Sequence, residues 1–307
     1  MSITIGVDIG GSHITSAAVD NATSKIIAGT YYRGPVNSKA SKDLIFKDWA
    51  RVINKTLNAI NSKETMGIGF AMPGPFQYKT GKAMFEKNDK YEALYQVSVA
   101  NELLAYLDSN KVVLRFLNDA SSFGLGGKLT NEFKEQEKVV AITIGTGFGA
   151  AFLVDNLPIS DDYFVPEGGC LWDKDYKKGI ADDYFSTRWF ITRYCFLSGK
   201  SDINGVKDIV HLNDKYTEQV FEEFSHNLAE FMLPYLIDFN TDLLLIGGNI
   251  TKSHQLFLPR ILDLWKKKGV NLPVTIIQNS EEANLIGASY LFNDNFWEKI
   301  KDALPAL

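Results

Sequence analysis

Two glycine-rich segments carry residues whose types and spacing suit phosphate binding. Residues 5–20 read IGVDIGGSHITSAAVD, and residues 140–155 read VAITIGTGFGAAFLVD. In each, an apolar run leads into a glycine-rich turn and then a second apolar run that ends in Asp. This pattern predicts a β-hairpin whose turn offers bare backbone N–H groups to an anion. The second copy begins 135 residues after the first, which indicates a duplicated domain with two such turns facing a nucleotide.

The turns also carry polar side chains suited to a bound nucleotide. The phosphate-binding candidates are Gly10, Gly11 and Ser12 in the first turn and Gly145, Thr146 and Gly147 in the second. Asp8, at the end of the first predicted strand, suits a hydrated Mg²⁺, which prefers carboxylate and water ligands. The alternative for either turn alone is an ordinary glycine-rich hairpin.

Two further segments follow predicted strands. Gly247, Gly248 and Asn249 come after the run LLLI, where a backbone without side chains can pack against a purine; a plain strand–helix turn is the alternative. Asp119 follows Asn118 at the end of the run VVLRFL. A carboxylate at the mouth of a strand is well placed as a general base, whereas a helix N-cap is its structural alternative.

Strand-like and helix-like segments surround these candidates. Strands are predicted at 3–7, 14–19, 67–72, 112–117, 139–144, 149–154, 243–246 and 274–277. Helices are predicted at 44–62, 99–107, 183–197, 217–239, 256–267, 281–292 and 296–303. Strands followed by helices indicate an α/β fold. We expect two domains, residues 1–118 joined by a C-terminal helix at 293–307, and residues 119–292.

Composition excludes several classes of protein. The chain has 307 residues, is 45% hydrophobic and carries a net charge of −5, which argues against nucleic acid or an anionic membrane as the main partner. Its two cysteines, Cys170 and Cys195, do not form a CxxC pair, which argues against a disulfide framework, a structural zinc site or an iron–sulfur cluster. With no signal peptide and no apolar run of about 20 residues, we expect a cytoplasmic protein.

In order along the chain, VDIGGS, MPGP, NDA, GTGFGA and LIGGN resemble the ROK family of bacterial carbohydrate kinases, within the sugar-kinase and actin superfamily. The resemblance covers nearly the whole chain. It implies two similar ribonuclease H-like domains around an ATP and sugar cleft, the actin-like ATPase fold. It also implies a glucokinase-like ATP:hexose phosphotransferase that uses Mg²⁺, acts on a 6-hydroxyl and forms a homodimer.

The same resemblance assigns roles to individual residues. Asp119 is the base that deprotonates the sugar hydroxyl. The two turns hold the ATP phosphates, Asp8 holds Mg²⁺ through water, and Gly247, Gly248 and Asn249 border the adenosine. The side chains that bind sugar are Asn88, Asn118, Glu167 and Asp182.

The chain departs from the family at the zinc-binding loop. Glu167-Gly168-Gly169-Cys170 stands where the family has Glu-x-Gly-His, and the following cysteine cluster is missing, so we expect no zinc site. Packing of the apolar and aromatic residues around Trp172, Tyr176 and Tyr184 would hold this loop instead. His13 stands where the family often has Lys, and we expect it to be exposed or packed on the hairpin. Because the zinc-binding motif is missing, the identity of the sugar is not determined by the resemblance. A glucose-like hexose is favoured over mannose, allose, fructose or N-acetylated hexosamines.

The alternative function is a catalytically idle sugar-binding or regulatory protein. Repressors of the family carry a DNA-binding helix-turn-helix before the first motif, whereas here only Met1 and Ser2 precede the first predicted strand. A radical-enzyme activator of the same superfamily would need cluster cysteines. We therefore expect a sugar kinase that binds no nucleic acid and no membrane.

Overall fold

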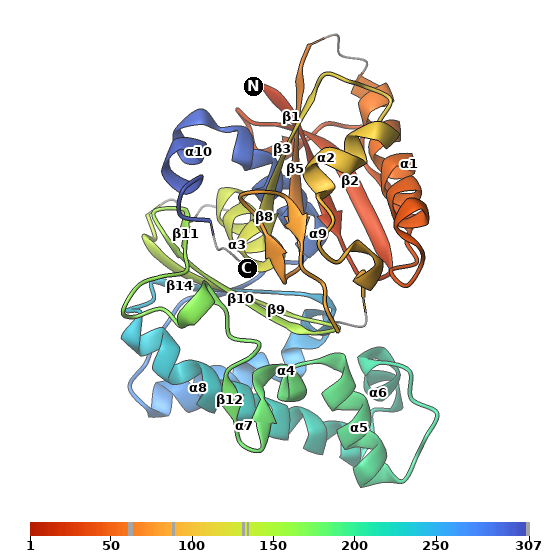
Figure 1. Ribbon diagram of the computed structural model, residues 1–307. Coiled ribbons are helices and arrows are strands. Elements are labelled where there is room, and N and C mark those ends of the chain that lie inside the picture. Colours follow the sequence, from red (N-terminus) through yellow and green to blue (C-terminus); the bar gives the residue numbers. More distant parts are fainter. Residues whose placement is uncertain (61–63, 88–89, 131–132, 134, 305–307) are drawn as a thin grey trace. The chain divides into compact units, whose positions relative to one another are not determined.

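The computed structural model, shown in Figure 1, divides into two compact units. It describes residues 1–60, 64–87, 90–130, 133 and 135–304. Unit 1 comprises Met1–Glu135, Asn156–Ser160 and Asn279–Leu307, and unit 2 comprises Gln136–Asp155 and Asp161–Gln278. Among the described residues, no helix combines the length and apolar character that crossing a membrane requires.

The sheet of unit 1 begins with the first predicted hairpin. Its strands are β1 (Ile3–Ile9), β2 (His13–Asp20), β3 (Lys25–Ile26), β4 (Tyr32–Pro35), β5 (Met66–Met72) and β8 (Val112–Asn118). They lie in the order β3-β2-β1-β5-β8, with β4 also paired to β2. β1 is antiparallel to β2 and parallel to β5, and β5 is parallel to β8. Because the strands run parallel on this side, β1 and β8 deliver Asp8 and Asn118 to the same edge of the sheet.

The sheet of unit 2 repeats this pattern. Its strands are β9 (Lys138–Ile144), β10 (Phe148–Val154), β14 (Leu243–Gly247) and β15 (Val274–Ile276), in the order β10-β9-β14-β15. β9 is antiparallel to β10 and parallel to β14, which is parallel to β15. Both predicted hairpins and their duplication are therefore confirmed, and Figure 1 shows the two sheets.

Helices cover each sheet. Those of unit 1 are α1 (Lys42–Ile60), α2 (Val99–Glu102), α3 (Asp119–Leu129), α9 (Ser280–Ser289) and α10 (Asp294–Ile300), with 3₁₀ turns η1 (Glu92–Leu94), η2 (Leu103–Tyr106) and η5 (Tyr290–Phe292). The unit also holds β6 (Phe76–Gln77), β7 (Lys82–Ala83) and β11 (Leu157–Ile159). The helices of unit 2 are α4 (Ala181–Tyr184), α5 (Thr187–Ser198), α6 (Val206–Leu212), α7 (Lys215–Asp238) and α8 (Leu258–Lys267), with 3₁₀ turns η3 (Glu167–Gly169) and η4 (Asn249–Leu256). The unit also holds the short strands β12 (Asp175–Tyr176) and β13 (Gly179–Ile180).

Helix α9 packs directly on the backbone of unit 1. A Cβ added at Gly6 in β1 would overlap the carbonyl oxygen of Leu285, and one at Gly126 in α3 would overlap that of Ala283. Because glycine has no side chain, the backbone of α9 can contact the backbones of β1 and α3 directly at these two positions. The sequence interpretation assigned 119–292 to the second domain, whereas α3 and α9 lie in unit 1 because of this close packing.

Candidate active site

The first glycine-rich turn leaves backbone donors open. The amide of Gly10 closes the turn onto the His13 carbonyl at 2.9 Å. Among the described residues, the next two amides, of Gly11 and Ser12, have no protein acceptor. The Tyr91 hydroxyl donates to the Gly10 carbonyl at 2.6 Å and so gives that oxygen a partner within the protein. Two adjacent free N–H groups form a site suited to an anion.

Asp8 lies buried beside this turn, with 7% of its surface exposed. Burial, reinforced by the negative charges of Asp119 and Glu281, raises the pKa of Asp8 to about 7. The Asn284 side chain on α9 donates to Asp8 Oδ1 at 3.0 Å. The other end of that amide, Asn284 Oδ1, is buried without a hydrogen-bond partner among the described residues.

These groups fit a hydrated magnesium ion. A divalent cation would favour the ionised form of Asp8, whose own environment favours the proton. Mg²⁺ keeps several of its waters, and the unsatisfied Asn284 Oδ1 is placed to accept a hydrogen bond from one of them. One carboxylate with a neighbouring amide oxygen suits an ion whose remaining ligands come from water and phosphate.

Asp119 is the first residue of α3, directly after β8. The helix cap is Asn118, whose Oδ1 accepts from the Ser121 amide at 3.2 Å while its Nδ2 donates to the Tyr78 hydroxyl at 3.1 Å. Asp119 Oδ1 accepts from the Ala120 amide at 2.9 Å, and burial raises the pKa of the carboxyl. The capping role considered for Asp119 is therefore filled by its neighbour Asn118.

Sequence reasoning missed Glu281, near the start of α9. Its carboxylate lies 3.2 Å from His13 Nε2 and 3.2 Å from Arg33, and it accepts from the Tyr31 hydroxyl at 2.8 Å. The hydrogen bond from His13 is the largest of the effects that lower the pKa of Glu281 to about 2. His13 is half-buried; its ring lies beside Gly10 of the hairpin, and its Nε2 faces Glu281 of α9.

The second turn, in unit 2, resembles the first in having two amides without a protein acceptor among the described residues, although its closing hydrogen bond spans one residue fewer. The Gly145 amide donates to the Gly147 carbonyl at 3.0 Å, and the amides of Thr146 and Gly147 have no acceptor within the described part of the chain. Thr187, at the start of α5, donates from both its amide and its hydroxyl to the Gly145 carbonyl, at 2.8 Å each. In each unit, therefore, the glycine-rich turn has two amides without an acceptor among the described residues. The carbonyl of its first glycine accepts a hydrogen bond from another segment of the same unit.

Asp182 lies against this second turn. Its Oδ1 accepts from the Phe148 amide at 2.7 Å, and its Oδ2 lies 3.1 Å from the Arg188 guanidinium. A Cβ added at Gly147 would lie only 2.9 Å from Asp182 Oδ1. Both oxygens of the residue expected to bind sugar thus have protein partners, and one of them fixes the turn.

The third glycine segment adjoins the second turn. Gly248 has a φ of 93°, and a Cβ there would overlap the Ile144 carbonyl at the end of β9. A Cβ at Gly145 would lie 3.8 Å from the Asn249 amide. Gly247, the last residue of β14, leads into this segment. The structure therefore brings the predicted adenosine and phosphate residues of unit 2 together.

Glu167 and Cys170 occupy the loop that replaces the family's zinc motif. Glu167 is exposed, and its carbonyl accepts from Lys174 Nζ at 3.1 Å. Burial and the neighbouring Asp173 carboxylate raise the pKa of Cys170 to about 11, so that its thiol stays protonated. Among the described residues there is no cluster of three or more His, Cys, Asp or Glu that could hold a metal ion.

Aromatic packing holds part of this loop. The Tyr176 ring lies 5.1 Å from that of Tyr184, 5.5 Å from Phe185 and 5.4 Å from Phe231, between ring centroids. Trp172, by contrast, is 49% exposed. Asn88, the remaining predicted sugar ligand, lies outside the described residues.

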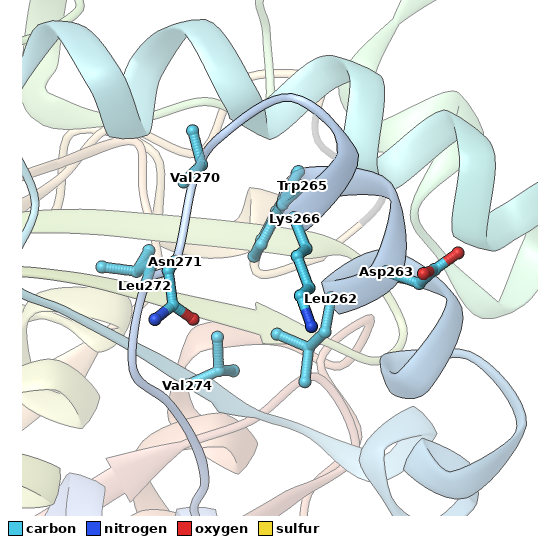
Figure 2. Close-up of a pocket in the computed structure, with 8 residues that line it drawn as sticks. All are labelled: Leu262, Asp263, Trp265, Lys266, Val270, Asn271, Leu272 and Val274. Carbon is cyan, nitrogen blue, oxygen red and sulfur yellow. The ribbon is translucent and has the colours of Figure 1, made fainter.

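A separate pocket of about 310 Å³ lies in unit 2 between α8 and residues 270–274. Figure 2 shows Leu262 and Lys266 of α8 lying toward Val274, while Asp263 points away. None of the predicted site residues lines this pocket. The pocket is therefore separate from both the first turn with Asp8 and Asp119 in unit 1 and the second turn with Asp182 in unit 2.

Solved structures with this fold cover nearly the whole chain. A ROK hexokinase from Thermus thermophilus aligns with a TM-score of 0.77 at 14% identity, covering 98% of this chain and 99% of that one. A ROK family glucokinase from Streptomyces griseus, in complex with glucose and AMPPNP, aligns with a TM-score of 0.70 at 18% identity, covering 94% and 98%. The protein thus has the actin-like ATPase fold.

Sequence comparison places the chain within one family of that fold. The profile of the ROK family matches residues 4–295, so the chain belongs to the ROK family. It is 23% identical to a glucokinase of Thermotoga maritima over 94% of this chain and 97% of that protein. It is also 20% identical to a xylose repressor of Bacillus spizizenii, over 84% of this chain and 67% of the repressor.

Proposed function

We propose that the protein is an ATP-dependent hexose kinase. The observation that carries this proposal is the pair of turns, each with two free amides, together with the Asp8 and Asp119 carboxylates beside the first. Membership of the ROK family supports it. The glucokinase relative, and the Streptomyces griseus glucokinase bound to glucose and AMPPNP, favour a glucose-like sugar and ATP as substrates.

In this proposal, the turns position the nucleotide. The amides of Gly11 and Ser12 and those of Thr146 and Gly147 donate hydrogen bonds to phosphate oxygens. Mg²⁺, held through water near Asp8 and Asn284, would neutralise charge on the phosphate oxygens. The adenosine is proposed to lie beside the segment of Gly247, Gly248 and Asn249, which adjoins the second turn.

Asp119 acts as the general base. It accepts the proton of the sugar hydroxyl while that oxygen bonds to the γ-phosphorus and the bond from γ-phosphorus to the bridging oxygen breaks, which releases ADP. Burial raises the pKa of Asp119, so the carboxylate is a stronger base than an exposed aspartate. By capping α3, Asn118 fixes the backbone from which Asp119 projects.

The sugar hydroxyls are the ligands proposed for Glu167, Asn118 and Asn88. Polar groups that pair with a hydroxyl discriminate against analogues that lack it, because the group is then left without that partner. For Asp182 we propose a positioning role, since its carboxylate already binds the Phe148 amide and Arg188.

An ADP-release assay tests the proposal. Mg-ATP is supplied with a panel of hexoses and N-acyl hexosamines, and Asp119→Asn is run beside the wild type. We expect turnover on a glucose-like sugar, with kcat lower by roughly 10²–10⁴-fold in the variant, the usual worth of a general base. Near-wild-type turnover by Asp119→Asn would remove Asp119 as the base.

A sugar-responsive regulator without catalysis is the second candidate. The likeness to the Bacillus spizizenii xylose repressor over 84% of this chain favours it. Calorimetry separates the two functions, because a regulator binds a sugar from the panel while the same preparation releases no ADP. Sugar-dependent ADP release that Asp119→Asn abolishes would exclude an idle protein.

A further inference from the structure

The side chain of Lys90 lies against the first glycine-rich turn. A Cβ added at Gly11 would lie 3.0 Å from Lys90 Cδ and Cε and 3.3 Å from Nζ. The ammonium group is therefore beside the residue whose amide, with that of Ser12, has no acceptor among the described residues. A cation next to two free N–H groups strengthens an anion site.

The neighbouring Tyr91 fixes Lys90 in this place. Tyr91 is buried, its amide donates to the Ser38 carbonyl at 2.8 Å, and its hydroxyl donates to the Gly10 carbonyl at 2.6 Å. Its ring packs edge-on against Trp49, with 5.4 Å between centroids. These contacts of Tyr91 fix the backbone next to Lys90 and so keep Lys90 at the turn, although the Lys90 side chain itself is exposed.

Two other basic side chains described at this turn already have a carboxylate partner. His13 and Arg33 both lie 3.2 Å from Glu281. Lys90, by comparison, forms no ion pair within the described ranges, and its charge acts on Asp119, where it opposes the effect of burial on the carboxyl pKa. The ammonium is thus within electrostatic reach of both the proposed base and the open turn.

We propose that Lys90 is a catalytic residue that binds the phosphoryl group being transferred. Its ammonium donates to oxygens of the terminal phosphate of a nucleoside triphosphate, while the amides of Gly11 and Ser12 hold the same group. The charge that Lys90 supplies offsets the repulsion between that phosphate and the carboxylates of Asp8 and Asp119. This inference rests on the proposed kinase function.

Lys90→Met tests the proposal, because it keeps the apolar stem on Gly11 and removes the charge. Binding of Mg-ATP and Mg-ADP is measured by calorimetry without sugar, and kcat is measured with the sugar found above. We expect kcat to fall by roughly 10- to 100-fold, the range for one charge-assisted hydrogen bond. Affinity for Mg-ATP should fall several-fold more than affinity for Mg-ADP.

Two further variants sharpen the result. Lys87→Met removes an exposed lysine from the same segment and should leave both affinities and kcat unchanged. Lys90→Arg should recover part of the ATP preference. Equal weakening of ATP and ADP binding, or wild-type values for Lys90→Met, would overturn the proposal. If the wild type binds Mg-ATP but phosphorylates no sugar, the kinase function fails, and the ATP-to-ADP affinity ratio still decides whether Lys90 reads the terminal phosphate.

Discussion

Asn284 donates a hydrogen bond to the Asp8 carboxylate at 3.0 Å across a sequence separation of 276 residues. The donor stands on α9 and the acceptor near the end of β1, so the pair ties the helix to the edge of the sheet that carries the first turn. The remaining amide oxygen of Asn284 is buried and unsatisfied within the described structure. The pair therefore orients Asp8 and leaves one buried acceptor of Asn284 without a partner in the described structure.

Asn284→Ala should weaken magnesium binding. The substitution removes the hydrogen bond that favours ionised Asp8 and the acceptor for a metal-bound water. Loss of a residue that hydrogen-bonds to a metal ligand typically lowers metal affinity or activity by about 10- to 100-fold. Activity titrated with Mg²⁺ at saturating ATP and sugar is the measurement. Asn58→Ala, an exposed control in α1, should give the wild-type curve, and an unchanged midpoint in Asn284→Ala would contradict the assigned role.

Asp8 should make stability fall as pH rises. Its pKa is raised from 3.8 to about 7, so the folded chain binds a proton that the unfolded chain releases, and stability is lost between these values. In metal-free buffer at pH 8, Asp8→Asn should therefore be more stable than the wild type, by up to about 4 kcal/mol at ~1.4 kcal/mol per pKa unit. Near pH 4 the two should converge. Urea unfolding at both pH values tests this, and a constant difference would show that the carboxyl is not responsible.

Glu281 should have the opposite dependence. Its pKa is lowered from 4.5 to about 2, so it contributes stability above pH 4.5 that is lost as pH falls toward 2. Glu281→Gln should be less stable than the wild type at pH 7 by about 1–2 kcal/mol, discounted for its partial exposure. Thermal melting at pH 7 and pH 2.5 provides the measurement. A deficit that persists undiminished at the lower pH would point to lost packing.

Asp182→Ala should impair nucleotide binding more than sugar binding. The change releases the Phe148 amide and so loosens the second turn. We expect the KM for ATP to rise roughly 10-fold, which corresponds to the net loss of one hydrogen bond to a charged group. Initial rates with each substrate varied in turn separate the roles, with Asp175→Asn as an exposed control. A rise confined to the KM for sugar would return Asp182 to the sugar-binding set implied by the family resemblance.

Local sequence signals predicted much of the fold but not the contacts between distant segments. The hairpins were readable because each couples alternating apolar runs to a glycine-rich turn, and the ROK resemblance supplied the order of the motifs. Asn284, Glu281 and Lys90 carried no comparable signal, because each reaches the first turn from an element far away in sequence. The cap on α3 fell to Asn118 because its backbone is extended and its side-chain oxygen faces the Ser121 amide, a choice between adjacent residues that spacing alone does not make.

Helix α9 belongs to unit 1 although it follows unit 2 in the sequence, and this order affects how the protein folds during synthesis. Every residue of unit 2 is synthesised before Ser280–Ser289 leaves the ribosome, yet that helix carries Asn284 and Glu281 and seals β1 at Gly6. Until then the nascent chain holds Asp8 and the first turn without the helix that completes them. Contacts of such long sequence separation form late and slowly. Unit 1 therefore cannot complete its fold until this last part of the chain has been synthesised, although its first strands are made before any residue of unit 2.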